Sequence, residues 1–229
     1  MQKGVGGNVG AGYTFMFSPQ WGVNTGVEAA FYKSRCDMDI ISGSQPETGN
    51  EGDFIFNSEM SHYHEKLQVT CLNIPVMLAF QTGRNVAFYG MAGVKLGIPL
   101  SAKYSGGGDL TTSGLFEYEQ QEYRNMPERG FGVYRDIESN GTLDAGLNIM
   151  PSMELGVKMA FGNGWAMHTG VYADFGVTDI RAGSHNQPLA GYQSNAPAQF
   201  KYHSITETEQ AGKMNVLSAG VRVRISMGN

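Results

Sequence analysis

The stretch GVGGNVGAGYTFMF, residues 4–17, alternates bulky apolar residues with small or polar ones. The odd positions carry Val5, Val9, Ala11, Tyr13, Phe15 and Phe17, and the even positions carry Gly4, Gly6, Asn8, Gly10, Gly12 and Thr14. Because side chains of a β-strand point to opposite faces with a period of two, this strand has one apolar and one small, polar face. Such a strand can separate lipid from a crowded polar interior.

The same alternation returns in three hairpins and a last strand. The hairpins cover about 4–33, 67–104 and 143–177, with tight turns at 18–21, 82–85 and 162–164, and the last strand covers about 214–227. Aromatic residues gather beside these turns, as at a membrane interface: Phe17, Trp21, Phe80, Phe88, Phe161 and Trp165. Seven strands are therefore evident.

The long connections, about 34–66, 105–141 and 178–213, all fall at the opposite end from the tight turns. Loops of this length are unusual in compact soluble domains, whereas tight turns at one end and long loops at the other are typical of outer-membrane barrels. We therefore predict one all-β domain over residues 1–229, an antiparallel up-and-down transmembrane β-barrel of the eight-stranded type.

Seven strands leave the first and the last running in the same direction, and an antiparallel barrel needs an even number. An open edge is not tolerated in lipid, so an eighth strand must come from residues before Met1, from a long loop or from a partner. Residues before Met1 are the most natural source. Export also requires a signal peptide, which we expect to have been removed.

Composition excludes several classes of protein. Charged residues make up only 16% of the chain, against about 25% in soluble domains. No run of about 18 apolar residues could span a bilayer as a helix. The net charge of -5 and the pI near 5.5 indicate no basic patch, so nucleic acid is not an expected partner. The expected location is the outer membrane, and the expected partner is its lipid bilayer.

The alternation of inward and outward positions along each predicted strand places eight charged residues inside the barrel: Glu28, Lys95, Asp144, Glu154, Lys158, Asp174, Arg222 and Arg224. The bore of an eight-stranded barrel is barely wide enough for side chains, so these charges must pair. The balance of four acids and four bases favours a plugged polar lumen with an ion-pair cluster over a porin-like channel. His168 shares this face, where we expect it to make a buried hydrogen bond.

The sequence predicts no catalytic residues, no metal and no cofactor. Barrel enzymes use Ser/His/acid or Asp/His sets near the outer rim, and no such set stands out. His62 and His64 have a spacing that can hold a metal on an extended segment, but they lack a clear third ligand. The glycines between Gly4 and Gly12 do not fit a phosphate-binding motif and more simply leave room for opposing lumen side chains.

Cys36 and Cys71 flank the first long connection on strands that should be neighbours. A disulfide is possible in an oxidising compartment. The apolar phase shifts near Cys71, however, and the two side chains need not face each other. Both outcomes stay open at this point.

The first two long connections are acidic and contain aromatic residues. The acids include Asp37, Asp39, Glu47, Glu51, Asp53, Glu117, Glu119, Glu122 and Glu128, and the aromatics are Phe54, Phe56, Tyr63, Phe116, Tyr118, Tyr123, Phe131 and Tyr134. They could form a binding surface for a protein partner. They could equally extend the strands beyond the membrane and pack on each other.

The segment LNIPVML, residues 72–78, followed after a turn by VAFYGMAG, residues 86–93, resembles the central hairpin of small outer-membrane barrels of Bacteroidota. These are the PorT-like, or outer membrane protein beta-barrel domain, proteins. The likeness covers nearly the whole chain and includes the hairpins at 10–27 and 155–176. It implies eight strands, with the family's first strand absent here, and an outer-membrane location. Such barrels usually close on a strand with a terminal aromatic residue, whereas this chain ends in ISMGN, residues 225–229.

The sequence as a whole predicts an integral outer-membrane barrel that is not an enzyme, with a plugged lumen and long outer loops for surface or partner contact. The first alternative is a soluble β-barrel that binds an apolar ligand in its interior. It would leave few charges on the solvated face and crowd large apolar residues into one narrow bore. The second alternative is a barrel enzyme acting on lipid or peptide at the outer rim.

Overall fold

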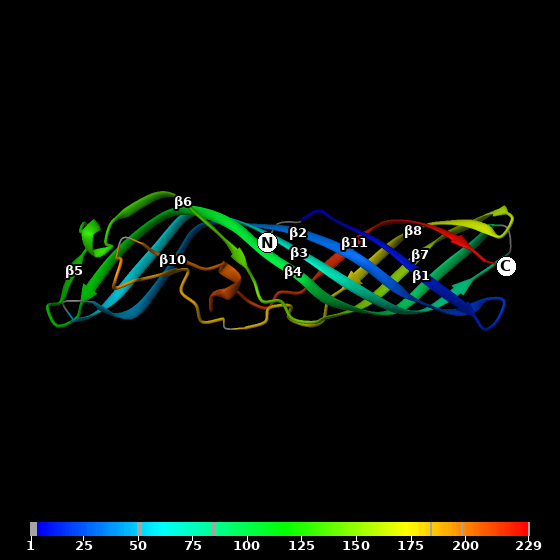
Figure 1. The fold of residues 1–229 in the computed structure, drawn as a ribbon, viewed down its shortest axis with the longest axis horizontal. Helices are drawn as coiled ribbons and strands as arrows, with labels where there is room; N and C mark the ends of the chain where they lie inside the picture. Colours follow the sequence, from blue (N-terminus) through cyan, green and yellow to red (C-terminus); the bar gives the residue numbers. More distant parts are fainter. Residues whose placement is uncertain (1–3, 50–51, 84–85, 184, 198, 229) are drawn as a thin grey trace.

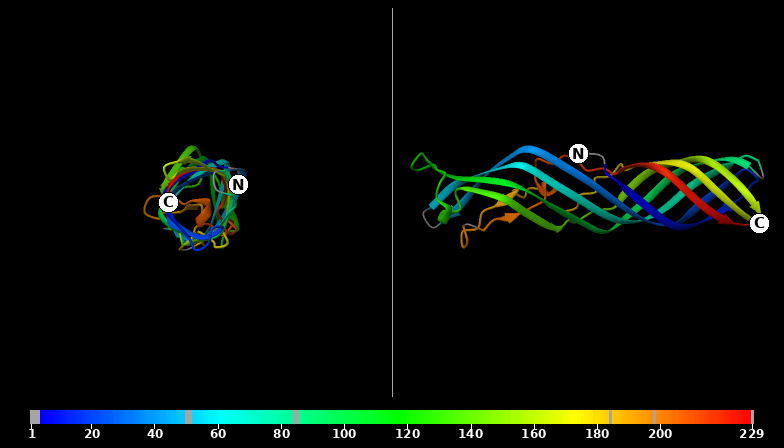
Figure 2. Two further views of the ribbon diagram at one scale, coloured as in Figure 1. Left: turned by 90° about the vertical axis from the view of Figure 1, so that its right-hand side faces the viewer. Right: turned by 90° about the horizontal axis from the view of Figure 1, so that it is seen from above.

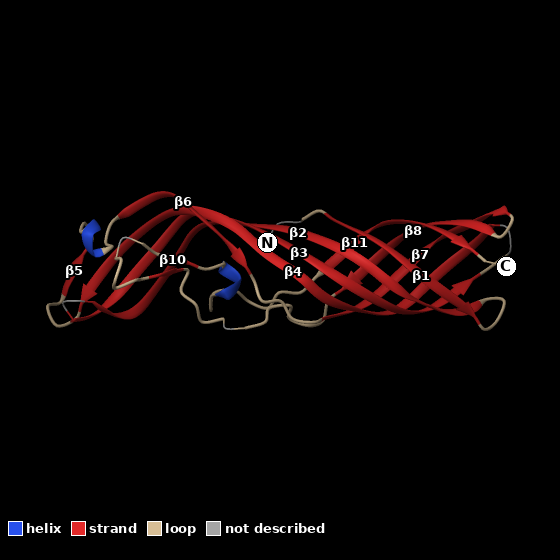
Figure 3. Ribbon diagram, viewed as in Figure 1, coloured by secondary structure: helices blue, strands red, loops and turns tan. Residues whose placement is uncertain are grey.

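The computed structural model describes residues 4–49, 52–83, 86–183, 185–197 and 199–228. Seven long strands dominate it (Figure 1): β1 (Gly6–Met16), β2 (Trp21–Gly49), β3 (Gly52–Gln81), β4 (Val86–Phe116), β7 (Asn148–Gly162), β8 (Trp165–Phe175) and β11 (Leu217–Met227). The shorter elements are β5 (Gln121–Tyr123), β6 (Val133–Thr142), β9 (Ala190–Gly191) and β10 (Lys201–Tyr202), with the 3-10 turns η1 (Pro127–Arg129) and η2 (Ile205–Glu207) (Figure 3). In these ranges no helix is long and apolar enough to cross a bilayer.

The seven long strands pair in the order β1-β2-β3-β4-β7-β8-β11, and each pair is antiparallel. This order confirms the predicted up-and-down barrel sheet. Seen from the end with the tight turns, the strands curve into a ring (Figure 2). No backbone pairing joins β1 to β11 in the described part of the chain. The third long connection does not bridge them, because β9 and β10 pair with each other. An eighth strand from one of the other two sources stays a prediction.

The tight turns form where the sequence places them. Asn163 and Gly164 have φ angles of 52° and 77° between β7 and β8. Positive φ at two successive turn residues matches the twist of antiparallel strands, and Asn and Gly tolerate it best. In the turn between β1 and β2, Ser18 Oγ accepts a hydrogen bond of 2.9 Å from the Trp21 amide. The turn predicted at 82–85 falls partly outside the described residues, which omit 84–85.

The outer wall of the ring carries an apolar band. Its exposed side chains include Val9, Phe15, Val27, Phe88, Leu155, Val171, Val221 and Ile225, and Phe17, Trp21, Phe161 and Trp165 lie beside the tight turns. Such a surface belongs in lipid. The band ends at Lys33, Gln68 and Lys103, three exposed residues that oppose one another across β2, β3 and β4. We take this row as the outer limit of the membrane-spanning segments. The soluble alternative is wrong, because the apolar face points outward.

Beyond this row the sheet continues. β2 has 29 residues, roughly 95 Å at about 3.3 Å per residue, whereas the apolar band of such barrels is about 25 Å tall. Most of the connections predicted at 34–66 and 105–141 are therefore strand, and β6 pairs with β4 from Thr142↔Lys103 to Val133↔Thr111. The sequence left open whether these acidic and aromatic residues form a binding surface or extend the strands beyond the membrane, and the structure shows the strand extension. Glu51, one of the acids, lies outside the described residues. We call the parts of β2, β3 and β4 beyond the row, with β5, β6 and residues 178–213, the extension.

A bulge interrupts β3 within the extension, a few residues beyond Gln68. The β3–β4 register shifts between Ser61 and His64, and His62 has a φ of 53°. The buried side chains are Phe56, Ser58 and Met60 on one side of this point and Tyr63, Glu65 and Leu67 on the other. The bulge therefore changes which alternate residues face inward.

Candidate functional site

The lumen of the membrane part holds a buried ion pair between β4 and β8. Lys95 Nζ lies 3.0 Å from Asp174 Oδ2 and 3.3 Å from Glu28 Oε2 of β2. The side chains of Lys95 and Asp174 are only 1% and 2% exposed. These residues alternate with outward apolar residues, so the strand period alone directs them inward.

Two arginines of β11 extend this contact into a network. Arg222 Nη1 lies 2.8 Å from Glu28 Oε1 and 3.3 Å from Glu154 Oε2. Arg224 Nη2 lies 2.8 Å from Glu154 Oε1. A continuous chain of contacts thus runs from Asp174 through Lys95, Glu28, Arg222 and Glu154 to Arg224. Every charge in it faces an opposite charge, as buried ions require.

Neutral side chains complete the network. Tyr89 donates a hydrogen bond of 2.8 Å to Glu154 Oε1, and Ser152 donates to Asp174 Oδ1. Asn8 Oδ1 accepts a hydrogen bond of 3.2 Å from Arg222 Nη2, whose guanidinium lies 4.8 Å from the ring centroid of Tyr172. Sequence reasoning missed these partners because it considered only charge. These residues alternate along their strands with the outward apolar residues, as the charged residues do, and this alternation could have identified them.

Two of the eight predicted residues do not belong to the ion-pair network, although Lys158 does line the lumen as predicted. Asp144 is exposed and precedes β7, which begins at Asn148, so strand parity does not apply to it. Lys158 does lie on β7, but its Nζ donates to Gln81 Oε1 at 3.1 Å, and it makes no ion pair with any described residue. The prediction of an eight-residue cluster is corrected to the six residues of the network.

His168 lies near the tight turns, with its Nε2 3.0 Å from Ser226 Oγ and its ring 5.1 Å from that of Tyr89. This is the hydrogen bond expected from the sequence. A cavity of about 980 Å³ occupies this half of the lumen. Glu28, Tyr89, Arg222 and Arg224 of the network line it, together with both faces of β1 and of the end of β11. The cavity therefore reaches the unpaired seam between β1 and β11.

A second buried carboxyl lies in the extension. Glu65 is fully buried and accepts hydrogen bonds from Tyr63 Oη at 2.5 Å, Ser204 Oγ at 2.8 Å and the Ile205 amide at 3.2 Å. Burial raises the pKa of Glu65 above its usual value, against the opposing effect of these hydrogen bonds. A capping box orders the donors: Ser204 Oγ accepts from the Thr206 amide, and Glu207 accepts from the Ser204 amide.

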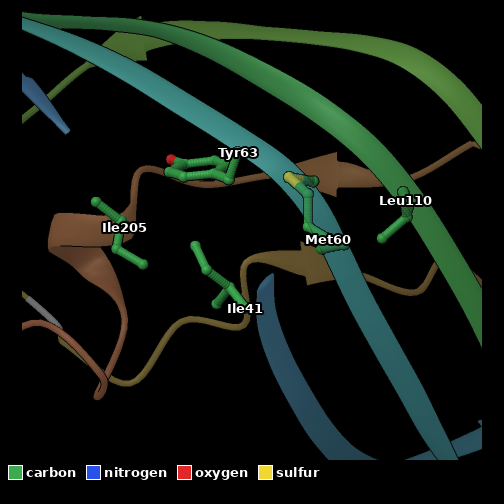
Figure 4. Packing of buried hydrophobic residues seen from close by; sticks show 6 residues of the cluster. Ile41, Met60, Tyr63, Leu110 and Ile205 are labelled. Atoms are coloured by element: carbon green, nitrogen blue, oxygen red, sulfur yellow. The ribbon is translucent and has the colours of Figure 1, made fainter. Parts of the chain in front are cut away.

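The same turn, η2, is anchored by apolar contacts. Ile205 belongs to a buried cluster with Ile41, Met60, Tyr63 and Leu110 (Figure 4). The third long connection thus folds back onto the inner side of β2, β3 and β4. No local pattern predicts this arrangement, because the Glu65–Ser204 contact spans 139 residues.

The cysteines do not form the disulfide that the sequence left possible. Cys36 opposes Glu65 and Cys71 opposes Ala30, so the two rows are six residues apart along either strand (65 to 71 and 30 to 36). Six residues correspond to about 20 Å, far beyond the reach of a disulfide. Both thiols are free and buried.

The histidines of the first connection are not drawn together around a site. His62 Nδ1 lies 3.4 Å from Asp109 Oδ2 at an exposed position on the bulge, and His64 is exposed as well. No group of three or more His, Cys, Asp or Glu residues in the described ranges is placed to hold a metal ion.

Residues 1–181 match a family model described as "Outer membrane protein beta-barrel domain". The match covers the long strands from β1 to β8. It includes every residue of the network except the two arginines of β11. It does not extend to the PorT-like and Bacteroidota assignment, which stays a prediction. No curated protein and no solved structure matches the chain.

Proposed function

Because this chain belongs to the outer membrane protein beta-barrel domain family and is an integral outer-membrane barrel, we propose that its bore is closed and that it presents the extension to partners outside the cell. No catalysis is part of this function. The observation that carries the proposal is the pairing of every network charge across the bore, with Lys95 and Asp174 almost inaccessible.

The charge balance of the network argues against conduction. Lys95, Arg222 and Arg224 oppose Glu28, Asp174 and Glu154, so no charge of one sign is left to select an ion. Selective pores instead line their narrowest part with unpaired charge or with carbonyl groups that face water. Further out, η2 lies against the inner side of the extension through Glu65 and Ile205. In the proposed closed bore, the network and η2 obstruct the path at two levels.

The extension has its own packed interior, which suits it for presentation. Near its tip, Phe54, Phe56 and Phe131 are buried, and the rings of Phe54 and Phe131 meet edge to face at 5.5 Å between centroids. Binding surfaces are commonly held by a rigid scaffold. The extension therefore offers a partner a fixed shape rather than loose loops.

The non-enzymatic part of the proposal rests on the histidines of the extension. His62 contacts Asp109, and His203 Nδ1 lies 2.8 Å from the carbonyl oxygen of Pro188. Within the described residues neither histidine forms a hydrogen bond with a Ser, Thr or Cys side chain, as a nucleophile–base pair would require.

Planar-bilayer recording tests the closed bore. The folded protein, verified by its heat-modifiable migration on a gel, should give no stable channels. The double variant Glu28→Ala with Arg222→Ala, which empties the centre of the network, should conduct more than the parent protein. A steady ohmic conductance in the parent protein would overturn the proposed closed bore.

Cysteine labelling on intact cells tests the presentation. Tyr118 is fully exposed near the tip of the extension, and Asn163 is exposed in a tight turn at the other end. Tyr118→Cys should react with a membrane-impermeant maleimide on intact cells, and Asn163→Cys only after the outer membrane is disrupted. The reverse result would place the extension inside the cell envelope and refute the proposal.

A further inference from the structure

In the extension, β2 continues past the end of its first partner. β1 pairs with β2 only from Gly6↔Tyr32 to Met16↔Gly22, whereas β3 stays paired with β2 as far as Gly49↔Gly52. From Cys36 to Gly49, no strand of the described chain pairs with the edge of β2 that β1 occupies nearer the membrane. The backbone amide and carbonyl groups of this edge form no ladder with a described strand, but the Ser42 carbonyl oxygen accepts a hydrogen bond from Gln210 Nε2, which an added strand would have to displace.

The two ends of this free edge carry features that block strand addition. Asp37 and Asp39 lie toward the membrane, and Pro46 and Glu47 lie toward the tip. Natural proteins protect exposed edges with charged residues and with proline. The stretch between them, from Ile40 to Gln45, has neither, and Ile40 is 61% exposed. Charged residues and proline therefore protect both ends of this edge, whereas its middle carries only the hydrogen bond between the Gln210 side chain and the Ser42 carbonyl oxygen among the described residues.

A cavity lies beside the unguarded stretch. It has a volume of about 260 Å³ and is bounded by residues 41–45 of β2, by β3 and β4, and by residues 186–190 and 208–210. Ile41, Met60 and Leu110 are its apolar residues from the sheet, while Ser42, Ser44, Ser58, Asn186, Gln187 and Gln210 add hydroxyl and amide groups. Glu209 is the one charged residue in this lining. The chemistry suits an uncharged side chain with an apolar body.

We propose that the edge of β2 from Ile40 to Gln45, with this cavity, binds an extended segment of a partner protein as an added β-strand. The inference rests on the proposed function, since it requires the extension to face the outside. In such recognition, main-chain hydrogen bonds supply affinity and alternate side chains enter neighbouring pockets. One side chain of the segment enters the 260 Å³ cavity.

The structure also sets the direction and composition of the segment. β1 already occupies the same edge of β2 in the antiparallel sense, and a strand that continues its line meets the same geometry. The segment therefore runs antiparallel to β2. Its centre is uncharged to match the cavity, and its ends carry basic residues, because Asp39 lies beyond one end of the open stretch and Glu47 beyond the other.

The test uses the full chain in detergent micelles and the fluorescein-labelled peptide KVTISVTK. A second peptide, KVPISPTK, keeps the charges but cannot form the ladder, because proline has no amide hydrogen to donate. Fluorescence anisotropy measures binding, and hydrogen exchange locates it. We expect saturable binding of the first peptide only, with slower exchange in residues 40–45 and no change in β6.

Two matched variants place the binding site. Ile40→Lys extends the charged guard into the open stretch, and Val133→Lys makes the same change at a similarly exposed residue, 63%, on β6 at the other side of the extension. Ile40→Lys should weaken binding about tenfold or more, which corresponds to at least about 1.4 kcal/mol. Val133→Lys should leave binding unchanged. Both positions are exposed, so the fold should tolerate either lysine.

Three results would overturn the inference. They are no saturable binding of KVTISVTK, equal weakening by the two lysine variants, and a parent protein that is a dimer and becomes monomeric with Ile40→Lys. The last result would assign the edge to a second copy of this chain. If any of them occurs while Tyr118→Cys is still labelled from outside, the inference fails and the proposed function stands.

Discussion

Lys95 Nζ lies 3.0 Å from Asp174 Oδ2 across the interior of the barrel, and almost no solvent reaches either side chain. Where water is excluded, the attraction between two opposite charges is strong, and the free-energy cost of leaving either charge unpaired is large. The pair contributes to the fold mainly because removing either member leaves the other as a buried charge with one opposite charge fewer.

Replacing Lys95 by Met should therefore destabilise the folded barrel by about 3 to 5 kcal/mol, because Asp174 loses the cation that it contacts. Urea unfolding of the protein in lipid vesicles measures the loss. Lys158→Met is the matched control, because Lys158 Nζ contacts the neutral amide oxygen of Gln81, and it should cost less than about 1 kcal/mol. Equal losses in the two variants would contradict a role for the buried pair.

Adding a methyl group at Gly170 should disturb the network indirectly. A Cβ there would lie 2.7 Å from Tyr89 Oη and 2.4 Å from the carbonyl oxygen of Leu155. Tyr89 would have to move and would lose its hydrogen bond to Glu154. Gly170→Ala should cost about 1 to 3 kcal/mol of unfolding free energy in the same urea experiment.

Two further variants separate this clash from a general effect of replacing glycine. Gly7→Ala adds a methyl group with no atom within 4 Å and should leave stability nearly unchanged. Tyr89→Phe removes the hydroxyl group and should recover part of the loss in Gly170→Ala. If Gly7→Ala costs as much as Gly170→Ala, the contact with Tyr89 is not the cause.

The membrane part could be predicted from the sequence because one physical rule acts on every strand. Lipid on one face and a narrow polar bore on the other enforce a period of two. That period places Glu28, Lys95 and Asp174 on the inner face without any knowledge of the register, which then decides that they meet. It failed for Asp144, which lies outside a strand. It placed Lys158 in the lumen correctly, but it could not show that the partner of Lys158 is the amide of Gln81 and not an acid.

The extension could not be predicted in this way, because no lipid constrains its outer face. Polar residues on both faces of β2 and β3 look like loop, and the bulge at His62 shifts the alternation. The burial of Glu65 depends on Ser204 and Ile205, which are distant in the sequence. No local pattern reports such a contact. The open stretch of β2 became visible only when the strand pairings were known.

The two thiols should remain reduced in the folded protein, because their rows are too far apart to bond. N-ethylmaleimide should add to neither Cys36 nor Cys71 until the barrel is unfolded by heat, and then to both. Intact-protein mass spectrometry counts the adducts. A protein that accepts two adducts only after a reducing agent is added would contain the disulfide that the register excludes.

The attachment of η2 should depend on pH through Glu65. Burial raises the pKa of this carboxyl in the folded protein, so the attached state binds a proton more readily than the detached state, where Glu65 has its ordinary pKa. The resulting stabilisation is complete below that ordinary value. It is lost as the pH rises through the raised pKa and is absent above it. The nearby Glu207 acts in the same direction, because its negative charge also raises the pKa of Glu65.

Hydrogen exchange of residues 203–208, corrected for the intrinsic effect of pH on exchange, measures the free energy of detachment. It should fall as the pH is raised from about 4 to about 8. Glu65→Gln cannot titrate. Its single amide oxygen can still accept from the Ile205 amide, and its NH2 group can donate to the Ser204 hydroxyl, which reverses its role, so the detachment free energy should stay nearly flat with pH. Glu207→Gln, which removes the neighbouring charge but keeps Glu65, should retain a smaller decline. A decline of the same size in Glu65→Gln would show that another group controls the attachment of η2.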